Sequence, residues 1–188
     1  GRRARGGTLF ISIAAGVPIS RLEGHLGANA RVIRVMPNAP AMVGQGMAAL
    51  VGGSHATKAD ETFAVKIFRA VGEAVVLRDE SLLDAVTALS GSGPAYVYLF
   101  VASMAEAAVK EGLPAGLALQ MALQTVRGAE QTMRQSRMAP SELIRIVASP
   151  GGTTEAALRK FAEAGFSGVI VGAIHAAADR SRELGRSR

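Results

Sequence analysis

The segment 148–155 carries the residue types that bind a small anion. Its sequence is Ala-Ser-Pro-Gly-Gly-Thr-Thr-Glu, and it joins two stretches with helical spacing. The proline removes one backbone donor, and the two glycines adopt backbone conformations that other residues resist. The N–H groups of Gly152, Thr153 and Thr154 then open the next helix, where backbone donors and the helix dipole attract an anion. With the hydroxyls of Ser149 and Thr154 as further partners, the segment fits a small carboxylate.

Two further segments follow predicted β-strands and could line a cofactor. Residues 8–13 and 31–36 are rich in β-branched side chains and stop at small or breaker residues. In a parallel sheet, ligands bind at the carboxyl ends of the strands. Small residues there let a flat ring or a ribose approach the backbone, and Asn38 offers both a donor and an acceptor. The two segments are Ala14-Ala15-Gly16 and Pro37-Asn38.

Each of these segments also has a purely structural interpretation. Glycine and proline are common in connectors, so segment 148–155 could be an ordinary link in which Thr153 caps the second helix. The two strand-end segments could likewise be turns without a ligand. Taken singly, the residues leave both interpretations open.

The elements that position these segments change in character along the chain. Up to about residue 78, strand-like segments alternate with amphipathic helices, and strand–helix–strand is the pattern of a βαβ unit with a parallel sheet. Asp79 and Glu80 interrupt this pattern, and everything after them has helical spacing. We therefore predict an α/β domain over residues 1–78, followed by an all-helical domain over 79–188.

The helix predicted to begin at Pro94 is apolar nearly all round, and such a helix must be buried on every side. In a domain of this size, a partner subunit is the expected cover. The preceding residues 90–93, Ser-Gly-Ser-Gly, lack the Gly-Lys-Ser/Thr ending of a phosphate loop. They also follow a helix rather than a strand. We expect a tight turn there, with Pro94 at the first helical position.

Composition excludes several classes of protein. The chain has 188 residues, of which 49% are hydrophobic and 19% charged, so it can bury a core. It has no cysteine, which excludes disulfides and thiolate metal sites. The three histidines, His25, His55 and His175, have no metal-ligand spacing, so no metal site is predicted.

Neither nucleic acid nor a membrane is a predicted partner. Arginines near the two ends account for five of the six net positive charges, and the chain has two tyrosines and no tryptophan. The apolar run 82–104 is interrupted by Asp84 and by residues 90–94, whereas a membrane helix needs about 18 apolar residues in a row. We expect a cytoplasmic protein. The arginines are Arg2, Arg3, Arg5, Arg186 and Arg188.

In combination, these segments resemble the pyrroline-5-carboxylate reductase family. Four motifs occur in the family's order and spacing, and the resemblance covers about residues 9–184. The motifs are Ile-Ser-Ile-Ala-Ala-Gly-Val at 11–17, Arg-Val-Met-Pro-Asn-Ala-Pro at 34–40, Ala-Leu-Ser-Gly-Ser-Gly-Pro-Ala-Tyr at 88–96 and Ala-Ser-Pro-Gly-Gly-Thr-Thr at 148–154.

The resemblance implies a Rossmann-type domain that binds NADPH or NADH, followed by a helical domain that dimerises and binds substrate. It implies a homodimer, and further assembly of dimers such as a decamer. The implied reaction transfers a hydride to the C=N carbon of 1-pyrroline-5-carboxylate and gives L-proline, the last step of proline biosynthesis. The cofactor carries that chemistry, and the protein orients the reactants.

The resemblance also assigns roles to single residues. Thr154 is the implied catalytic residue, as hydrogen-bond partner or proton relay at the ring nitrogen. The substrate loop of one subunit is implied to face the cofactor of the other. The implied substrate-binding residues are Ser149, Gly151, Gly152, Thr153 and Thr154, and the implied cofactor-binding residues are Ala14, Ala15, Gly16, Pro37 and Asn38.

One large departure separates this chain from the family pattern. The family begins with a strand and a Gly-x-Gly-x-x-Gly/Ala turn that holds the pyrophosphate, and nothing here supplies that turn. Roughly 90 residues of a doubly wound domain are then missing, so we expect little or no activity from the chain alone. The alternative is a non-catalytic dimerisation module. A hydroxyacid dehydrogenase is disfavoured, because those enzymes lack the 149–154 motif and use a lysine base, whereas Lys110 lies outside any matching motif.

Overall fold

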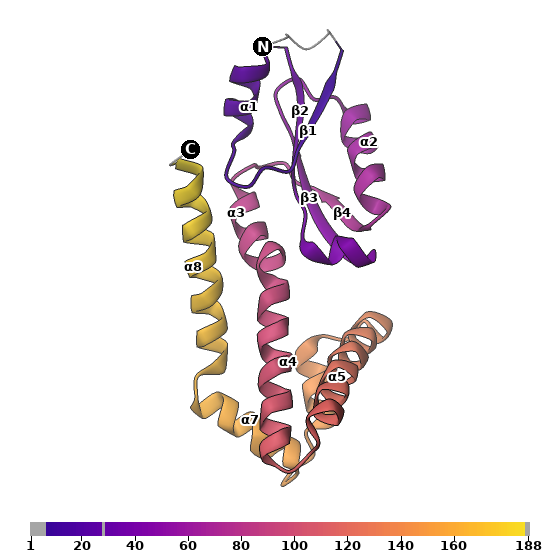
Figure 1. The fold of residues 1–188 in the computed structure, drawn as a ribbon, viewed down its shortest axis with the longest axis vertical. Helices are drawn as coiled ribbons and strands as arrows, with labels where there is room; N and C mark the ends of the chain where they lie inside the picture. The colour runs from indigo at the N-terminus through magenta and orange to yellow at the C-terminus, as the bar shows by residue number, and fades with distance from the viewer. Residues whose placement is uncertain (1–6, 28, 187–188) are drawn as a thin grey trace. The chain divides into compact units, whose positions relative to one another are not determined.

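The computed structural model describes residues 7–27 and 29–186, and its contacts divide the chain into two units (Figure 1). The first unit, called here the sheet unit, contains the residues up to Pro94 and those from Ala173 onward. The second, the helical unit, is Ala95–Gly172. The predicted domain boundary at residue 79 stays a prediction.

The sheet unit contains a four-stranded sheet in the order β1-β2-β3-β4. The pairs β1–β2 and β3–β4 are parallel, as strand–helix–strand connections require. The parallel pairing predicted for the first strand–helix–strand unit is confirmed, whereas β2 and β3 are antiparallel. Only the short turn Ala39–Val43 joins them, and a parallel crossover needs a dozen or more residues. The strands are β1 Leu9–Ser12, β2 Arg31–Met36, β3 Gly46–Gly52 and β4 Gly72–Val76.

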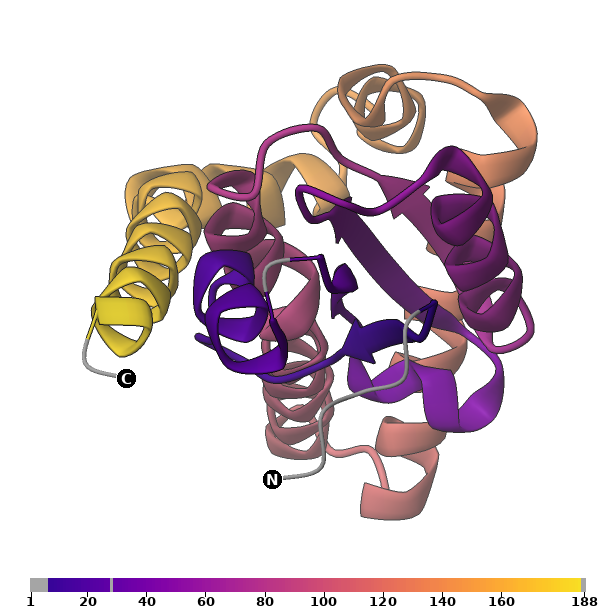
Figure 2. The same ribbon diagram turned by 90° about the horizontal axis from the view of Figure 1, so that it is seen from above.

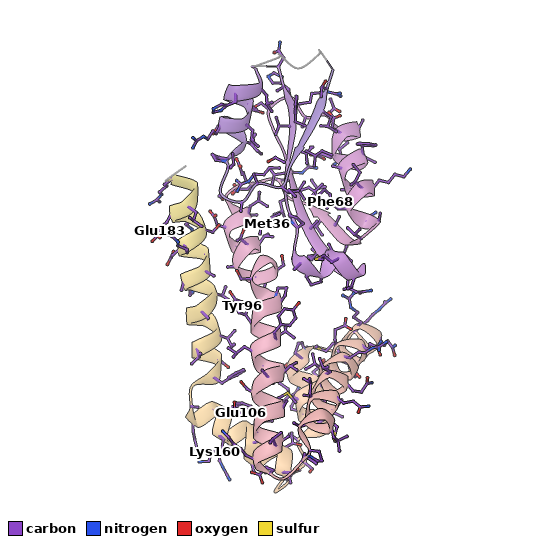
Figure 3. The ribbon with its side chains drawn as sticks, viewed as in Figure 1. Met36, Phe68, Tyr96, Glu106, Lys160 and Glu183 are labelled. Atoms are coloured by element: carbon purple, nitrogen blue, oxygen red, sulfur yellow. The ribbon has the colours of Figure 1, made fainter. Side chains whose placement is uncertain are left out.

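Helices cover both faces of this sheet (Figure 2). On one face, Leu50 of β3 packs with Ala64 and Phe68 of α2, Lys58–Arg69 (Figure 3). On the other, Val51 packs with Ile19 of α1, Ile19–Leu26, and with α3, Leu82–Val86. Successive β3 residues therefore face opposite helices, as in a buried strand. This confirms the predicted doubly wound α/β arrangement.

Helix α2 begins at a capping box formed by Thr57 and Asp60. The Asp60 N–H donates to Thr57 Oγ1 at 3.2 Å, and the Thr57 N–H donates to Asp60 Oδ2 at 2.9 Å. Asp60 also pairs with Arg31 of β2 at 2.9 Å, which ties the start of α2 to the sheet. On α2, Ala64 is buried whereas Phe63 and Ile67 are exposed, because the side chains that face the sheet are at positions 60, 64 and 68.

After the sheet the chain is helical, which confirms the predicted change from α/β to all-α. The helices are α4 Gly93–Lys110, α5 Ala115–Ser136, α6 Pro140–Val147, α7 Thr153–Glu163 and α8 Phe166–Arg186.

The Ser-Gly-Ser-Gly segment is not the tight turn that we predicted. A π-helical turn, Thr87–Gly91, joins α3 to α4, and the Ser92 N–H donates to the Thr87 carbonyl at 2.8 Å. The hydroxyls of Thr87 and Ser90 donate to carbonyls one turn back, which keeps the path helical. Gly91 leaves room for Met36, whose Cε would lie 2.7 Å from a Cβ there (Figure 3).

Because this path is continuous, the apolar run is not interrupted as the sequence suggested. By length and composition, the helical path from Leu82 to Lys110 could cross a membrane, and α7 and α8 pass the same test only when taken together. Within Leu82–Lys110, only 11% of the most apolar 18-residue stretch is buried inside the chain. A helix whose apolar surface is covered by a second subunit is as long and as apolar as a membrane helix.

Candidate functional site

The two predicted cofactor segments leave the same edge of the sheet. Residues 14–16 follow β1 and residues 37–38 follow β2, and these strands run parallel with Ser12 opposite Arg34. Ala14 and Ala15 are exposed. Gly16 has a φ of 70°, and a Cβ there would lie 3.4 Å from the Leu184 backbone in α8. The structure thus brings these segments together at the carboxyl ends of two neighbouring strands, where ligands bind in such sheets.

Asn38 uses both ends of its amide within the sheet unit. Its Oδ1 accepts the Met47 N–H at 2.8 Å, and its Nδ2 donates to the Ser90 carbonyl at 3.0 Å. The donor and the acceptor that the sequence indicated are therefore engaged with the start of β3 and with the π-helical turn. In this arrangement Asn38 shapes the end of β2 and fixes the position of the neighbouring Pro37.

A carboxylate lies beside these segments that was not predicted from the sequence. Glu80 Oε1 accepts the Ile19 N–H at 2.9 Å and lies 2.5 Å from Arg34 Nη1. A nearby hydrogen bond of 2.6 Å joins Ser181 Oγ to Asp84 Oδ1. These partners are 46 to 97 residues apart, so no local spacing could have indicated them. They border a cavity of roughly 310 Å³, lined by Gly16, Pro18, Arg34, Glu80, Ser81, Asp84, Arg182 and Gly185.

The predicted carboxylate-binding loop, residues 149–154, lies in the helical unit between α6 and α7. Gly151 has a φ of 70°, which favours glycine, and a Cβ on Gly152 would lie 2.5 Å from Ser149 Oγ. Gly152 occupies the N-cap of α7, so the alternative in which Thr153 caps the helix is wrong. A glycine cap supplies no side-chain acceptor, which leaves the first N–H groups of α7 available to an anion from outside.

A carboxylate of the chain itself already binds this loop. The Gly151 N–H donates to Glu155 Oε2 at 2.6 Å. Glu155 was not among the predicted site residues, although an acidic residue in the first turn of a helix is a recognisable signal. The contact shows that a backbone N–H of this loop donates to a carboxylate oxygen at hydrogen-bonding distance.

The sheet unit therefore contains the predicted cofactor segments, and the helical unit contains the predicted carboxylate-binding loop. Across residues 7–27 and 29–186, no group of three or more His, Asp and Glu side chains is placed to hold a metal ion. The chemistry that these segments support is the binding of a carboxylate and of a flat cofactor ring.

Residues 80–184 match the profile of the pyrroline-5-carboxylate reductase dimerisation family. Among curated relatives, the pyrroline-5-carboxylate reductase of Pseudomonas aeruginosa is 45% identical over 176 residues, which are 94% of this chain and 64% of the relative. That of Methanosarcina acetivorans is 46% identical over 178 residues, or 95% of this chain and 66% of the relative. The chain thus spans just under two thirds of the length of these relatives.

Solved structures give the same result. The pyrroline carboxylate reductase of Plasmodium falciparum, with NADP bound, matches with a TM-score of 0.89 at 34% identity. The match covers 94% of this chain and 67% of that one. The reductase of Coxiella burnetii matches with a TM-score of 0.91 at 35% identity, over 95% of this chain and 67% of that one.

Proposed function

The chain belongs to the pyrroline-5-carboxylate reductase family, and from this premise we propose that it reduces 1-pyrroline-5-carboxylate to L-proline. NADPH or NADH is the proposed reductant. The observation that supports this best is the loop at residues 149–154, which holds the Glu155 carboxylate on a backbone N–H and leaves further donors at the start of α7. A carboxylate-binding loop suits a substrate whose ring carries a carboxylate.

The loop binds the substrate carboxylate in place of Glu155. The N–H groups of Thr153 and Thr154 donate to its two oxygens, with Gly151 and the Ser149 hydroxyl beside them. The Gly152 N–H donates to the Ser149 carbonyl at 3.0 Å, so Gly152 shapes the loop around the carboxylate. Charge-assisted hydrogen bonds of this kind are about twice as strong as neutral ones. The helix dipole of α7 adds to the attraction. The carboxylate is thereby fixed, and with it the orientation of the ring.

Thr154 is the proposed catalytic residue. When bound, the reduced nicotinamide supplies a hydride to the C=N carbon. The ring nitrogen takes up a proton as that bond becomes single, and the Thr154 hydroxyl donates the hydrogen bond that holds or delivers this proton. The nitrogen and the carboxylate would then be held by neighbouring groups of one helix terminus, so the reacting carbon has one orientation.

The residues at the ends of β1 and β2 fit the nicotinamide end of the cofactor. Ala14 and Ala15 are small and exposed, and Gly16 brings the backbone close to α8, so a flat ring meets little side-chain bulk. Pro37 and Asn38 form the neighbouring wall. The glycine-rich turn that holds a dinucleotide pyrophosphate is not within these 188 residues. We therefore expect this chain alone to turn over little or no substrate.

A second copy of the chain is the proposed partner of the helical unit. On α4, Tyr98 is 63% exposed and Leu99 70% exposed, and further apolar side chains on α5 and α8 are exposed as well. A second copy would cover these surfaces, and its substrate loop would face the cofactor segments of the first. Assembly of dimers into a decamer and a cytoplasmic location belong to the same proposal.

The test is an absorbance assay on two proteins. One is the 188-residue chain. The other, called here the extended enzyme, carries the amino-terminal third of the Pseudomonas aeruginosa relative fused ahead of Thr8. With 1-pyrroline-5-carboxylate and NADPH or NADH, we expect turnover by the extended enzyme and little by the chain alone. A folded, dimeric extended enzyme without turnover would favour the alternative, a dimerisation module that does no chemistry.

A further inference from the structure

We propose that Glu80 is a positioning residue, which holds the loop at residues 14–18 in the shape that receives the nicotinamide. The proposal rests on the function proposed above, since that function assigns the loop to the cofactor. Glu80 does not belong to any of the motifs that carry the family resemblance. Its contacts with Ile19 and Arg34 in the sheet unit indicate that it positions the loop.

One oxygen of Glu80 joins the end of the loop to the sheet. Oε1 accepts the N–H of Ile19, the first residue of α1, at 2.9 Å. The N-cap residue of α1 is Pro18, which supplies no side-chain hydrogen bond, so the acceptor comes from Glu80 instead. Since Ile19 is buried, its N–H depends on a partner within the protein.

The same oxygen holds the second cofactor segment through Arg34. Arg34 Nη1 lies 2.5 Å from Glu80 Oε1, and the arginine side chain is only 14% exposed. Arg34 lies on β2 three positions before Pro37. A single carboxylate therefore fixes the start of α1 against β2, and the two cofactor segments flank this junction.

The other side of the loop is held by α8. A Cβ at Gly16 would lie 3.4 Å from the backbone of Leu184, so the loop and the helix are in close approach. The Asp84 carboxylate fixes that helix by accepting the Ser181 hydroxyl at 2.6 Å. Glu80 and Asp84 lie four residues apart, so one short stretch of chain anchors the loop through α1 and through α8.

The direct test is amide hydrogen exchange at Ile19 in the 188-residue chain. We expect Glu80→Ala to raise the exchange rate of this amide about tenfold, as the loss of one buried hydrogen bond would do. Glu80→Gln keeps an acceptor oxygen, so it should raise the rate less. The matched control is Glu61→Gln, which removes a glutamate of the same unit that pairs with Lys58 at 2.7 Å. Equal exchange at Ile19 in Glu80→Ala and in the unchanged chain would overturn the proposal.

The functional test uses the extended enzyme. Glu80→Ala should raise the KM for NADPH about tenfold while the KM for pyrroline-5-carboxylate stays unchanged, and Glu80→Gln should recover part of the loss. A change in both constants, or in neither, would contradict the positioning role. If the unchanged extended enzyme shows no turnover, the proposed function fails, and the exchange measurement still decides whether Glu80 holds the loop.

Discussion

The sheet unit and the helical unit bury their apolar residues in different ways. In the sheet unit, Val32, Ile33 and Leu50 are fully buried between the sheet and its helices. In the described part of the helical unit, the buried apolar residues are only Val101, Ala118 and Ala122. Larger side chains there, such as Tyr98 and Leu99, lie on the surface instead.

The two units are therefore stabilised by different contacts. The sheet unit closes a core from its own chain, with helices on both faces. The helical unit exposes more apolar surface than a free-standing domain usually does, which supports the proposal that a second copy of the chain completes its core. Folding and assembly are therefore expected to be separable in the first unit and coupled in the second.

We expect the greatest loss of assembly and activity from a charge introduced on α4. Leu99→Asp places a charge on the surface that we assign to the second copy, where an unpaired charge would be desolvated. We expect the dimer to dissociate in light scattering and the extended enzyme to lose its activity. Glu106→Gln on the same helix is the control, because its pair with Lys110 is exposed. A Leu99→Asp protein that stays dimeric would remove α4 from the interface.

A substitution at Thr154 tests whether the helical unit acts in the chemical step while the sheet unit binds the cofactor. In the extended enzyme, Thr154→Ala should lower kcat about a hundredfold, in the range for loss of one proton-transfer or hydrogen-bonding group. The KM for NADPH should stay unchanged, because the cofactor segments are in the sheet unit. An unchanged kcat would exclude Thr154 from the mechanism.

The third prediction concerns acid stability of the sheet unit. The hydrogen bond from the Thr57 backbone holds the pKa of Asp60 below its ordinary value near 3.8; burial opposes this, while the Thr57 side chain and Arg31 add to it. Because the folded pKa is the lower one, this contribution is complete above the unfolded pKa and is lost as pH falls below it. Asp60→Asn should cost about 1–3 kcal/mol of unfolding free energy at pH 7.

Urea unfolding of both proteins at pH 7 and at lower pH measures this contribution. The difference between Asp60→Asn and the unchanged chain should shrink as the carboxyl group becomes protonated. A difference that does not depend on pH would assign the cost to packing. The pKa of Glu106 in the helical unit is also lowered, by its hydrogen bond to Lys110 and by the charge of that lysine. That pair is exposed, so we expect no comparable acid dependence from it.

A smaller effect is expected at Glu155, which occupies one donor of the substrate loop. Glu155→Gln removes a carboxylate that competes with the substrate, so the KM for pyrroline-5-carboxylate should fall about threefold, as one helix-terminus charge interaction would give. Steady-state kinetics of the extended enzyme measure this change. A higher KM would mean that Glu155 supports the loop rather than competing for it.

The smallest effect is expected at Arg137, which ends α5 with a φ of 56°. This conformation costs little for glycine and more for an arginine. Arg137→Gly should raise the unfolding free energy of the helical unit by about 0.5–1 kcal/mol. Thermal unfolding gives the value, and a loss of stability would show that the arginine side chain contributes more than its backbone strain costs.

Local signals in the sequence predicted the elements better than their connections. The strand at 31–36 was predicted with its observed bounds, because a β-branched run ends there at Pro37. The antiparallel β2–β3 pair was not predicted, because it depends on pairing across a short turn. The π-helical turn was not predicted either, because it depends on side-chain hydroxyls that donate to carbonyls of the preceding turn.

In the candidate site too, features set by neighbouring residues were predictable and features set by distant residues were not. The loop at residues 149–154 was predictable because its donors and its glycines are adjacent in the sequence. The contacts of Glu80 and the engaged amide of Asn38 were not, because their partners lie far along the chain. Long-range contacts of single side chains leave no periodicity in a sequence, and only the fold reveals them.

Subunit mixing in the extended enzyme tests most directly whether each active site is built from two chains. Ala15→Phe fills the proposed nicotinamide position in the sheet unit, and Thr154→Ala removes the proposed catalytic hydroxyl in the helical unit, so each variant alone should keep about a hundredth of the activity or less. After dissociation and joint reassembly, random pairing should restore about a quarter of the activity, because half the dimers then carry one intact site built from two chains. Mixed dimers that form and remain inactive would contradict a site shared between subunits.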